Sequence, residues 1–393
     1  MNHAFLPYGR QTIDDADVAA VAAALRSDYL TTGPLVAQFE TAFAAASGAA
    51  HAVASNSGTA ALHLAAMAAG LGPGDAAIVP SVTFLATANA VRMTGAEVVF
   101  ADVDADTGLL TPATLHAASA RASAAGMKVR AALPVHLNGR VCDMSALGAE
   151  AKSGGFVLIE DACHALGLPG IGACAHSIAA CFSTHPVKAI ATGEGGVTTV
   201  ADAALAKKMM SLRSHGMVRD PALFENRELA FDGNTANPWY YEMPEFGWNY
   251  RMPDVLCALG LSQLAKLDAF QQRRRSLAAL YDRLLAPLAP VLQTVPHAGA
   301  AHGWHLYAVL IDFAKLGKTR GTLMRELHAR GIGSQVHYTP VHLQPYYTRR
   351  YGVLDLPGAD AYYARCLSIP FYPTLSDDDA ARVAGAFADL LGA

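Results

Sequence analysis

Seven short apolar runs alternate with alanine- and leucine-rich stretches over the first 250 residues of the chain. The apolar runs are His51–Ala54, Ala76–Val79, Glu97–Ala101, Val129–Val135, Phe156–Ile159, Ile178–Phe182 and Gly196–Val200. The stretches of helical composition are Thr59–Ala69, Thr83–Met93, Pro112–Ala125 and Met144–Lys152. This alternation predicts crossover units and a mostly parallel, seven-stranded sheet of an α/β protein. Ligands of such sheets bind at the carboxyl ends of the strands, so the residues after each run are candidates for a site.

The pattern changes near Pro253, and we expect a large α/β domain over residues 1–252 and a smaller α+β domain over residues 253–393. The elements predicted for the second domain are a long helix at Leu256–Leu285, strands at His305–Ile311 and Gly333–His337, and helices at Gly321–Arg330 and Asp377–Leu391. Ser376 is expected to cap the last of these helices. Between the domains, Asp232–Pro244 is rich in turn-forming and aromatic residues, which predicts an ordered loop.

Composition narrows the class of protein. The chain has 393 residues, of which 52% are hydrophobic, and its formal net charge is −4. The fraction of hydrophobic residues is enough for a large core, and the charge argues against a general nucleic-acid binder. The six cysteines are scattered without a CxxC pair, which is typical of free thiols in a reducing compartment. No signal peptide and no apolar run long enough to span a membrane is apparent, so we expect a soluble cytoplasmic protein.

Lys188 stands apart from the other seven lysines. It follows an apolar run and precedes Gly193, Gly195 and Gly196 in the stretch CFSTHPVKAIATGEGG. A lysine among small residues loses hydration, so its amine is more easily deprotonated and becomes nucleophilic. The glycines allow the backbone to pass close to a ligand. By itself the pattern leaves two interpretations open, a reactive amine and a structural lysine beside a turn.

A second candidate is IEDACHALG, which ends an apolar run. Asp161 is well placed there to hold a protonated ring nitrogen, with His164 close by on the same side. The alternative is that Asp161 caps a helix and that His164 is a buried, hydrogen-bonded side chain.

A third candidate is the turn SNSGTAALHL, where small residues open a helix. The N–H groups at such a helix N-terminus bind phosphate, although a plain capped helix start gives the same pattern. Neither a Walker loop nor a GxGxxG sequence is present, which disfavours a nucleoside triphosphate or NAD site.

Together the motifs SGTAAL, TFLATANA, EDACHALG, CFSTHPVKAIATGEGG, RSHG and GWNYRMPDVLCALGLSQL resemble the DegT/DnrJ/EryC1/StrS family. The resemblance covers nearly the whole chain and implies a fold-type I, pyridoxal-5′-phosphate (PLP)-dependent sugar aminotransferase. It implies that Lys188 attaches the cofactor covalently and that Asp161 pairs with its pyridine nitrogen. His164 corresponds to a ring-contacting position where many relatives carry Gln, and Phe84 to the aromatic that stacks on the ring.

The resemblance also assigns the cofactor phosphate. Gly58 and Thr59 correspond to the phosphate-binding turn, and Ser183 to a phosphate-contacting serine. Asn249 corresponds to a residue that reaches the phosphate from the partner subunit, which implies a homodimer with shared sites. Some family members have His in place of the lysine and act as dehydratases, and Lys188 argues against that role here.

Several further residues are candidates for the substrate site, and each has a structural alternative. The substrate candidates are His136, Arg213, His215, His337 and Tyr338. Glu194 is interpreted either as a turn residue or as an acid catalyst. The run Arg273–Arg275 is expected to be a solvated helix face, with contact to a nucleotide diphosphate as the alternative. His337 and His342 lack a third ligand at metal-binding spacing, so no metal site is expected.

The resemblance implies transfer of an amino group from glutamate to a keto sugar nucleotide. The segments RSHGM and QVHYTPVHLQPYY are most similar to those of transaminases of UDP-4-keto-6-deoxy-N-acetylhexosamines, the type used in the pseudaminic acid pathway, which would serve surface glycan synthesis. A GDP-perosamine-type enzyme and a dTDP-3- or 4-keto sugar aminotransferase remain alternatives. So do a regulatory relative without catalysis and an isomerase or lyase on the same fold.

Overall fold

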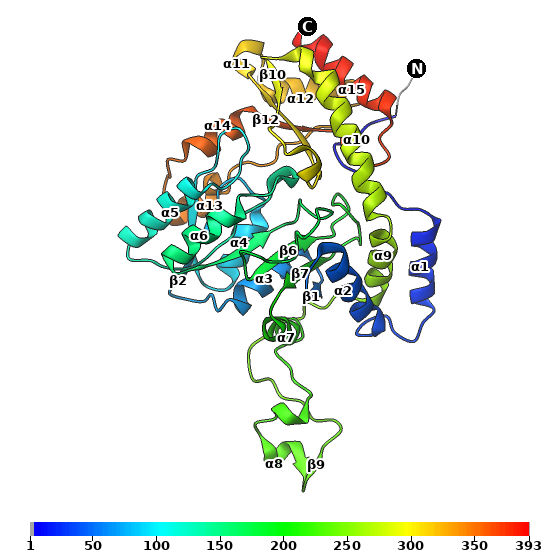
Figure 1. Ribbon diagram of the computed structural model, residues 1–393, viewed down its shortest axis with the longest axis vertical. Coiled ribbons are helices and arrows are strands. Elements are labelled where there is room, and N and C mark those ends of the chain that lie inside the picture. The colour runs from blue at the N-terminus through cyan, green and yellow to red at the C-terminus, as the bar shows by residue number, and fades with distance from the viewer. Residues whose placement is uncertain (1–3, 393) are drawn as a thin grey trace.

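The computed structural model describes residues 4–392 and is built around a seven-stranded sheet (Figure 1). Its strands are β1 (His51–Ser55), β2 (Asp75–Pro80), β3 (Glu97–Ala101), β4 (Lys128–Ala132), β5 (Val157–Asp161), β6 (Ala179–Ser183) and β7 (Gly196–Val200). They lie in the order β1-β7-β6-β5-β4-β2-β3, and β7 alone runs antiparallel to its neighbours. The prediction of a mostly parallel seven-stranded sheet is therefore confirmed.

Helices connect consecutive strands of this sheet, as the alternating pattern predicts. They are α3 (Gly58–Ala68), α4 (Leu85–Met93), α5 (Pro112–Ala124) and α6 (Met144–Gly154). The N-terminal helices α1 (Asp15–Leu25) and α2 (Pro34–Ser47) and the helix α7 (Ala203–Leu212) complete this part of the chain. The strands β2 and β7 are buried at every position, because helices pack on both faces of a parallel sheet.

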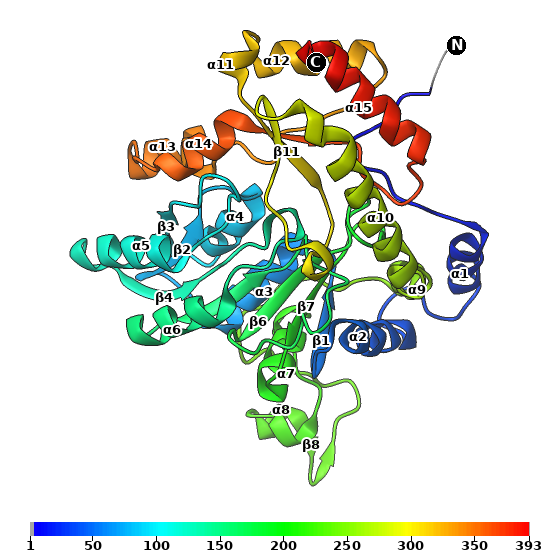
Figure 2. The same ribbon diagram turned by 45° about the horizontal axis from the view of Figure 1, so that its top comes forward.

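The C-terminal part adds a three-stranded antiparallel sheet, ordered β10-β11-β12, with its own helices (Figure 2). The strands are β10 (Leu292–Thr294), β11 (Tyr307–Ile311) and β12 (Cys366–Ile369). The helices are α9 (Asp254–Leu264), α10 (Leu267–Leu285), α11 (Phe313–Leu316), α12 (Arg320–Ala329), α13 (Pro345–Tyr351), α14 (Pro357–Arg365) and α15 (Asp377–Leu391). The Ser376 hydroxyl accepts a hydrogen bond from the Asp379 N–H, so its predicted capping role is confirmed. The division into two domains at residue 252 stays a prediction.

The predicted helix Leu256–Leu285 is two helices, α9 and α10, that meet at Lys266. The chain bends where its packing partners change, since α9 packs on α1 and α2 whereas α10 packs on α15. The Lys266 amine lies 2.6 Å from the Asp17 carboxylate of α1, which fixes the junction.

The predicted strand at Gly333–His337 is wrong. Only Gln335 forms a sheet-like bridge, to Ser368, whereas Gly333 donates its N–H to the carbonyl of Leu6. The segment thus changes its hydrogen-bonding partner within two residues and cannot extend a ladder. The third strand of the small sheet is β12 instead.

The expectation of a solvated face at Arg273–Arg275 is wrong for its middle residue. Arg274 is 2% exposed, whereas Arg275 is exposed and Arg273 pairs with Asp377. Neighbouring residues on a helix point in different directions, so the middle arginine turns inward.

The stretch Asp232–Pro244 is part of a projecting segment, residues 215–248. The segment contains α8 (Arg227–Ala230) and the short strands β8 (Phe231–Asp232) and β9 (Thr235–Ala236), which extend away from the body of the molecule (Figure 1). Its ends meet at the bridge between Ser214 and Asn249.

All six cysteines are free thiols. Among residues 4–392, no helix combines the length and the apolar character needed to cross a membrane.

Candidate functional site

A cavity of about 410 Å³ lies at the carboxyl ends of the sheet strands. The turns after β1, β2, β4, β5 and β6 all contribute to its wall, as expected for a parallel sheet. Ten of the residues singled out in the sequence line it together, namely Gly58, Thr59, Phe84, Asp161, His164, Ser183, Lys188, Glu194, His337 and Tyr338.

Lys188 follows β6 in a turn that is closed by a hydrogen bond from its own N–H to the carbonyl of His185 (2.8 Å). Burial lowers the pKa of the Lys188 amine, even though Cys163 and Asp161 act in the opposite direction. A lowered pKa increases the fraction of neutral amine, which is the nucleophilic and proton-accepting form.

Asp161 is the last residue of β5 and is 5% exposed. Its Oδ2 accepts a hydrogen bond from the Thr87 hydroxyl (2.7 Å), and its Oδ1 accepts one from the Cys163 N–H (3.2 Å). Within the described chain, β5 is followed by β6 with no helix between them, so the alternative interpretation of Asp161 as a helix cap is wrong. The carboxylate is instead held rigidly at the wall of the cavity.

Thr87 was missed in the sequence because nothing distinguishes it from its neighbours in the apolar helix α4. Its hydroxyl also shares a hydrogen bond with the Thr83 hydroxyl (2.8 Å), so a short chain of hydroxyl groups supports Asp161. The structure reveals Tyr8, Cys163, His185 and His305 as further residues that line the cavity without having been singled out.

We expect Thr87→Val to lower kcat about 10–100-fold, because it removes one hydrogen bond to a charged group while it preserves the shape of the side chain. Thr87→Ser keeps the hydroxyl and is the matched control that should stay close to wild type. Steady-state kinetics and the Kd of the apoenzyme for PLP check the prediction. Wild-type values for the Val variant would show that the hydrogen bond does not support Asp161.

His164 is held at both ring nitrogens. Its Nδ1 accepts a hydrogen bond from the Asn138 N–H (3.3 Å), and its Nε2 lies 3.2 Å from the Tyr338 hydroxyl. The His305 ring packs against it with 4.3 Å between centroids. Burial, together with the positive charge of Lys188, places the pKa of His164 well below its usual value. The ring is therefore neutral at physiological pH and carries its proton on Nε2.

His337 and Tyr338 close another side of the cavity. The His337 Nδ1 hydrogen-bonds to the Ser368 hydroxyl (2.8 Å), and burial lowers the pKa of His337 to about 3. Burial raises the pKa of the Tyr338 hydroxyl well above its usual value. Both side chains are thus uncharged, and Lys188 and Asp161 are the titratable groups of this wall suited to proton transfer and charge pairing.

The helix α3 aims its N-terminus at the cavity. Ser57 caps the helix by accepting a hydrogen bond from the Ala60 N–H (3.1 Å), which leaves the N–H groups of Gly58 and Thr59 without helical acceptors. A Cβ at Gly58 would lie 2.8 Å from the Ser183 Cβ, so only glycine allows this close approach. The Phe84 side chain also lines the cavity and is 55% exposed. Its ring centroid lies 5.9 Å from that of Tyr338.

Four candidate residues do not line this cavity. His136 is fully buried and hydrogen-bonds to Glu160 (2.8 Å), whereas Arg213 pairs with Glu40 and donates to the Ala54 carbonyl (2.6 Å). His215 and Asn249 belong to the base of the projecting segment. Glu194 does line the cavity. No cluster of metal-ligating side chains occurs among residues 4–392.

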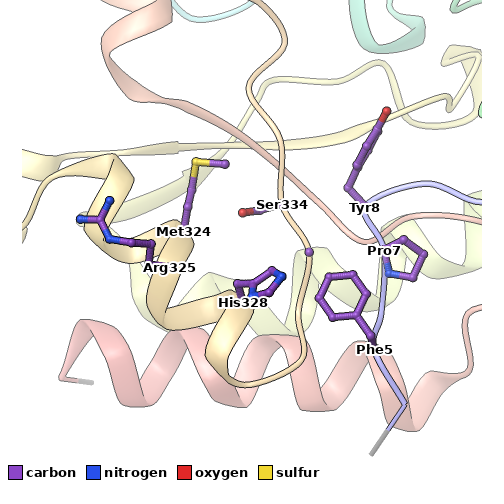
Figure 3. Close-up of a pocket in the computed structure, with 8 residues that line it drawn as sticks. Phe5, Pro7, Tyr8, Met324, Arg325, His328 and Ser334 are labelled. Carbon is purple, nitrogen blue, oxygen red and sulfur yellow. The ribbon is translucent and has the colours of Figure 1, made fainter.

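A separate hollow of about 380 Å³ lies between the N-terminal segment and α12 (Figure 3). Phe5 and Pro7 face His328 and Met324 across it, and the Tyr8 ring points away from it. Its lining contains neither a carboxylate nor a lysine, so it lacks the pair of groups that the larger cavity brings together.

Residues 11–388 match the DegT/DnrJ/EryC1/StrS aminotransferase family. The chain belongs to this family. It is 40% identical over 396 residues to the spore coat polysaccharide biosynthesis protein SpsC of Bacillus subtilis (strain 168), covering 99% of this chain and 98% of that protein. Helicobacter pylori PseC, an aminotransferase involved in the biosynthesis of pseudoaminic acid, has a similar structure, with a TM-score of 0.86 and 26% identity over 99% of both chains. The PLP-form of Spr1654 from Streptococcus pneumoniae has a TM-score of 0.85 and 26% identity, again over 99% of both chains.

The protein is therefore a PLP-dependent sugar aminotransferase with the fold-type I architecture. The residues that line the cavity also fit this cofactor, independently of the family match. A buried carboxylate, an amine with a lowered pKa and a helix N-terminus face one space, and the missing side chain of Gly58 lets Ser183 lie close to that N-terminus. These features suit a pyridine nitrogen, an aldehyde and a phosphate, respectively.

Proposed function

We propose that this enzyme moves an amino group from glutamate to a 4-keto-6-deoxy sugar nucleotide, most closely UDP-4-keto-6-deoxy-N-acetylhexosamine. The observation that carries the proposal is the single cavity in which Lys188 faces Asp161 beside the N-terminus of α3. The similarity over nearly the full chain to PseC and SpsC supports a role in surface glycan or nonulosonic acid synthesis. The free cysteines fit a cytoplasmic setting.

In this proposal each residue has a role. PLP, when bound, supplies the electron sink for the pair left by a broken C–H bond. Lys188 takes the proton from the α-carbon of the amino donor. When the amino group passes to the keto sugar, Lys188 returns a proton to the sugar carbon that receives it. The lowered pKa of Lys188 suits it to both steps. Asp161, fixed by the hydrogen bonds from Thr87 and Cys163, would pair with the ring nitrogen of the cofactor.

The remaining cavity residues bind and orient. Gly58, Thr59 and Ser183 would hold the phosphate, and Phe84 and His164 would contact the ring. Because His164 is neutral, it would contact the cofactor ring without adding a positive charge beside the ring nitrogen that pairs with Asp161. His337 and Tyr338 are assigned to the sugar. His136, Arg213 and His215 stay candidates for substrate contacts only if the partner subunit or a conformational change brings them closer, since none lines the cavity in one chain.

A panel of keto sugar nucleotides with ¹⁵N-glutamate tests the proposed substrate. We expect label in the product and the highest kcat/KM for the UDP-4-keto-6-deoxy-N-acetylhexosamine. Higher kcat/KM with a GDP-4-keto-6-deoxymannose or a dTDP-keto sugar would overturn the proposed substrate but not the reaction. Turnover without label in the product would favour an isomerase or lyase, and no turnover with any keto sugar would favour a regulatory role.

We also propose an obligate homodimer in which Asn249 serves the phosphate of the neighbouring subunit. Asn249 is exposed and does not line its own cavity, although its carbonyl lies next to Asn56 at the base of the phosphate turn. The adjoining segment carries Trp239 and Phe246 with 73% and 71% of their surface exposed. Large exposed aromatic side chains of this kind are typical of protein interfaces.

Mixing two inactive variants tests the shared site. Lys188→Ala and Asn249→Asp place their defects in the same site of a mixed dimer, so its other site is intact. Random exchange should restore about a quarter of wild-type activity, since half of the dimers are mixed and each has one working site. Each variant must be inactive alone. Proven subunit exchange without recovery of activity would contradict the shared site.

A further inference from the structure

Arg274, on the inward face of α10, is a buried cation that has no acidic partner among residues 4–392. Its side chain is 2% exposed, and its Nε and Nη1 make no hydrogen bond within the part of the chain that the structure describes. Burial lowers the pKa of the guanidinium to about 10, so the group is still charged at neutral pH. An uncompensated buried ion with unsatisfied donors is costly, which calls for a partner that the chain itself does not supply.

A small cavity of about 10 Å³ adjoins Arg274. Thr12, whose buried hydroxyl also has no hydrogen-bonding partner in residues 4–392, lines the same cavity. Lys188 and Arg10 line it as well, but no Asp or Glu does. The cavity therefore combines unsatisfied donors with an excess of positive charge, the opposite of a cation site.

The size of the cavity restricts its occupant. About 10 Å³ is roughly the room that one water-sized particle needs, so a carboxylate or a phosphate does not fit. The unsatisfied groups of Arg274 and Thr12 can each donate a hydrogen bond. An acceptor is required, and the excess of positive charge selects an anion over a neutral water molecule.

We propose that this cavity binds a single monoatomic anion, such as chloride, between Arg274 and Thr12 and next to Lys188. The anion compensates the charge of Arg274 and satisfies donors that are otherwise unpaired. The site is separate from the main cavity, although Lys188 lines both.

Bromide is the probe, because its anomalous scattering distinguishes it from water in a crystal. Crystals of the holoenzyme grown in bromide should show an anomalous peak within hydrogen-bonding distance of Arg274 and Thr12. The peak should be lost in Arg274→Met, and retained in Arg275→Met, the exposed neighbour on the same helix. A water at this position without an anomalous peak would overturn the proposal.

Thermal unfolding gives a second readout that does not depend on activity. The Tm of wild type and of Arg275→Met should be about 1–3 °C higher in sodium chloride than in sodium gluconate at equal ionic strength, because the anion binds the folded state. Arg274→Met should lose this difference. If the Arg274 variant does not fold, the bromide peak in wild type alone decides. Equal Tm values for wild type in both salts, together with no anomalous peak, would mean that the site holds only water.

Discussion

Lys188→Ala is expected to abolish amino transfer, with a loss of activity of at least about 10⁴-fold. The substitution removes both the amine that attaches PLP and the base assigned to proton transfer. Lys188 lies in a turn after β6, outside the helices and strands of the described chain, so the fold should survive. Steady-state turnover, the visible absorbance of the bound cofactor and the Tm check the prediction, and the first two should change while the third stays close to wild type.

Two control variants separate chemistry from charge. Lys188→Arg keeps the positive charge but does not readily deprotonate, so it should be nearly as inactive as the Ala variant. Lys152→Ala, an exposed lysine near the end of α6, should leave turnover unchanged. Near-normal transamination by Lys188→Ala would contradict the proposed mechanism.

The large sheet could be predicted because most of its strands are mainly apolar, although β4 contains Lys128 and Arg130. The bounds of β3 and β7 agree with the predicted runs, and helix α15 begins and ends where its cap and pattern place it. The small sheet was harder to predict, because β12 is a four-residue strand whose sequence, CLSI, has no alternation. The segment Gly333–His337 looks like a strand but divides its hydrogen bonds between two partners.

The reactive groups were visible in the sequence because each of them follows an apolar run, and parallel strands bring those ends together. The residues that support these reactive groups do not follow an apolar run, so the sequence pattern does not reveal them. Thr87 lies within a helix, and His305 precedes a strand of the other sheet. The inward position of Arg274 did leave a signal, because it continues the spacing of Leu267 and Gln271 toward Leu277 along α10. Its charge led to the opposite expectation.

Asp161→Asn is expected to lower kcat by about 10³-fold, or about 4 kcal/mol of barrier, with little effect on folding. An amide oxygen can still accept the hydrogen bond from Thr87, so the local packing is preserved. A neutral amide does not hold a pyridine nitrogen protonated, and the electron sink is weakened. Steady-state kinetics and the Tm measure the two effects separately.

Asp143→Asn is the matched control. Asp143 caps α6 by accepting a hydrogen bond from the Ala146 N–H (3.0 Å), and Asn caps helices about as well as Asp. The same change there should therefore leave both kcat and Tm close to wild type. An Asp161→Asn enzyme with normal kinetics would show that only the hydrogen-bonding shape of this side chain matters, and the proposed charge pair with the ring nitrogen would be wrong. A large fall in kcat at position 161, with none at position 143, would assign the effect to the negative charge at the end of β5.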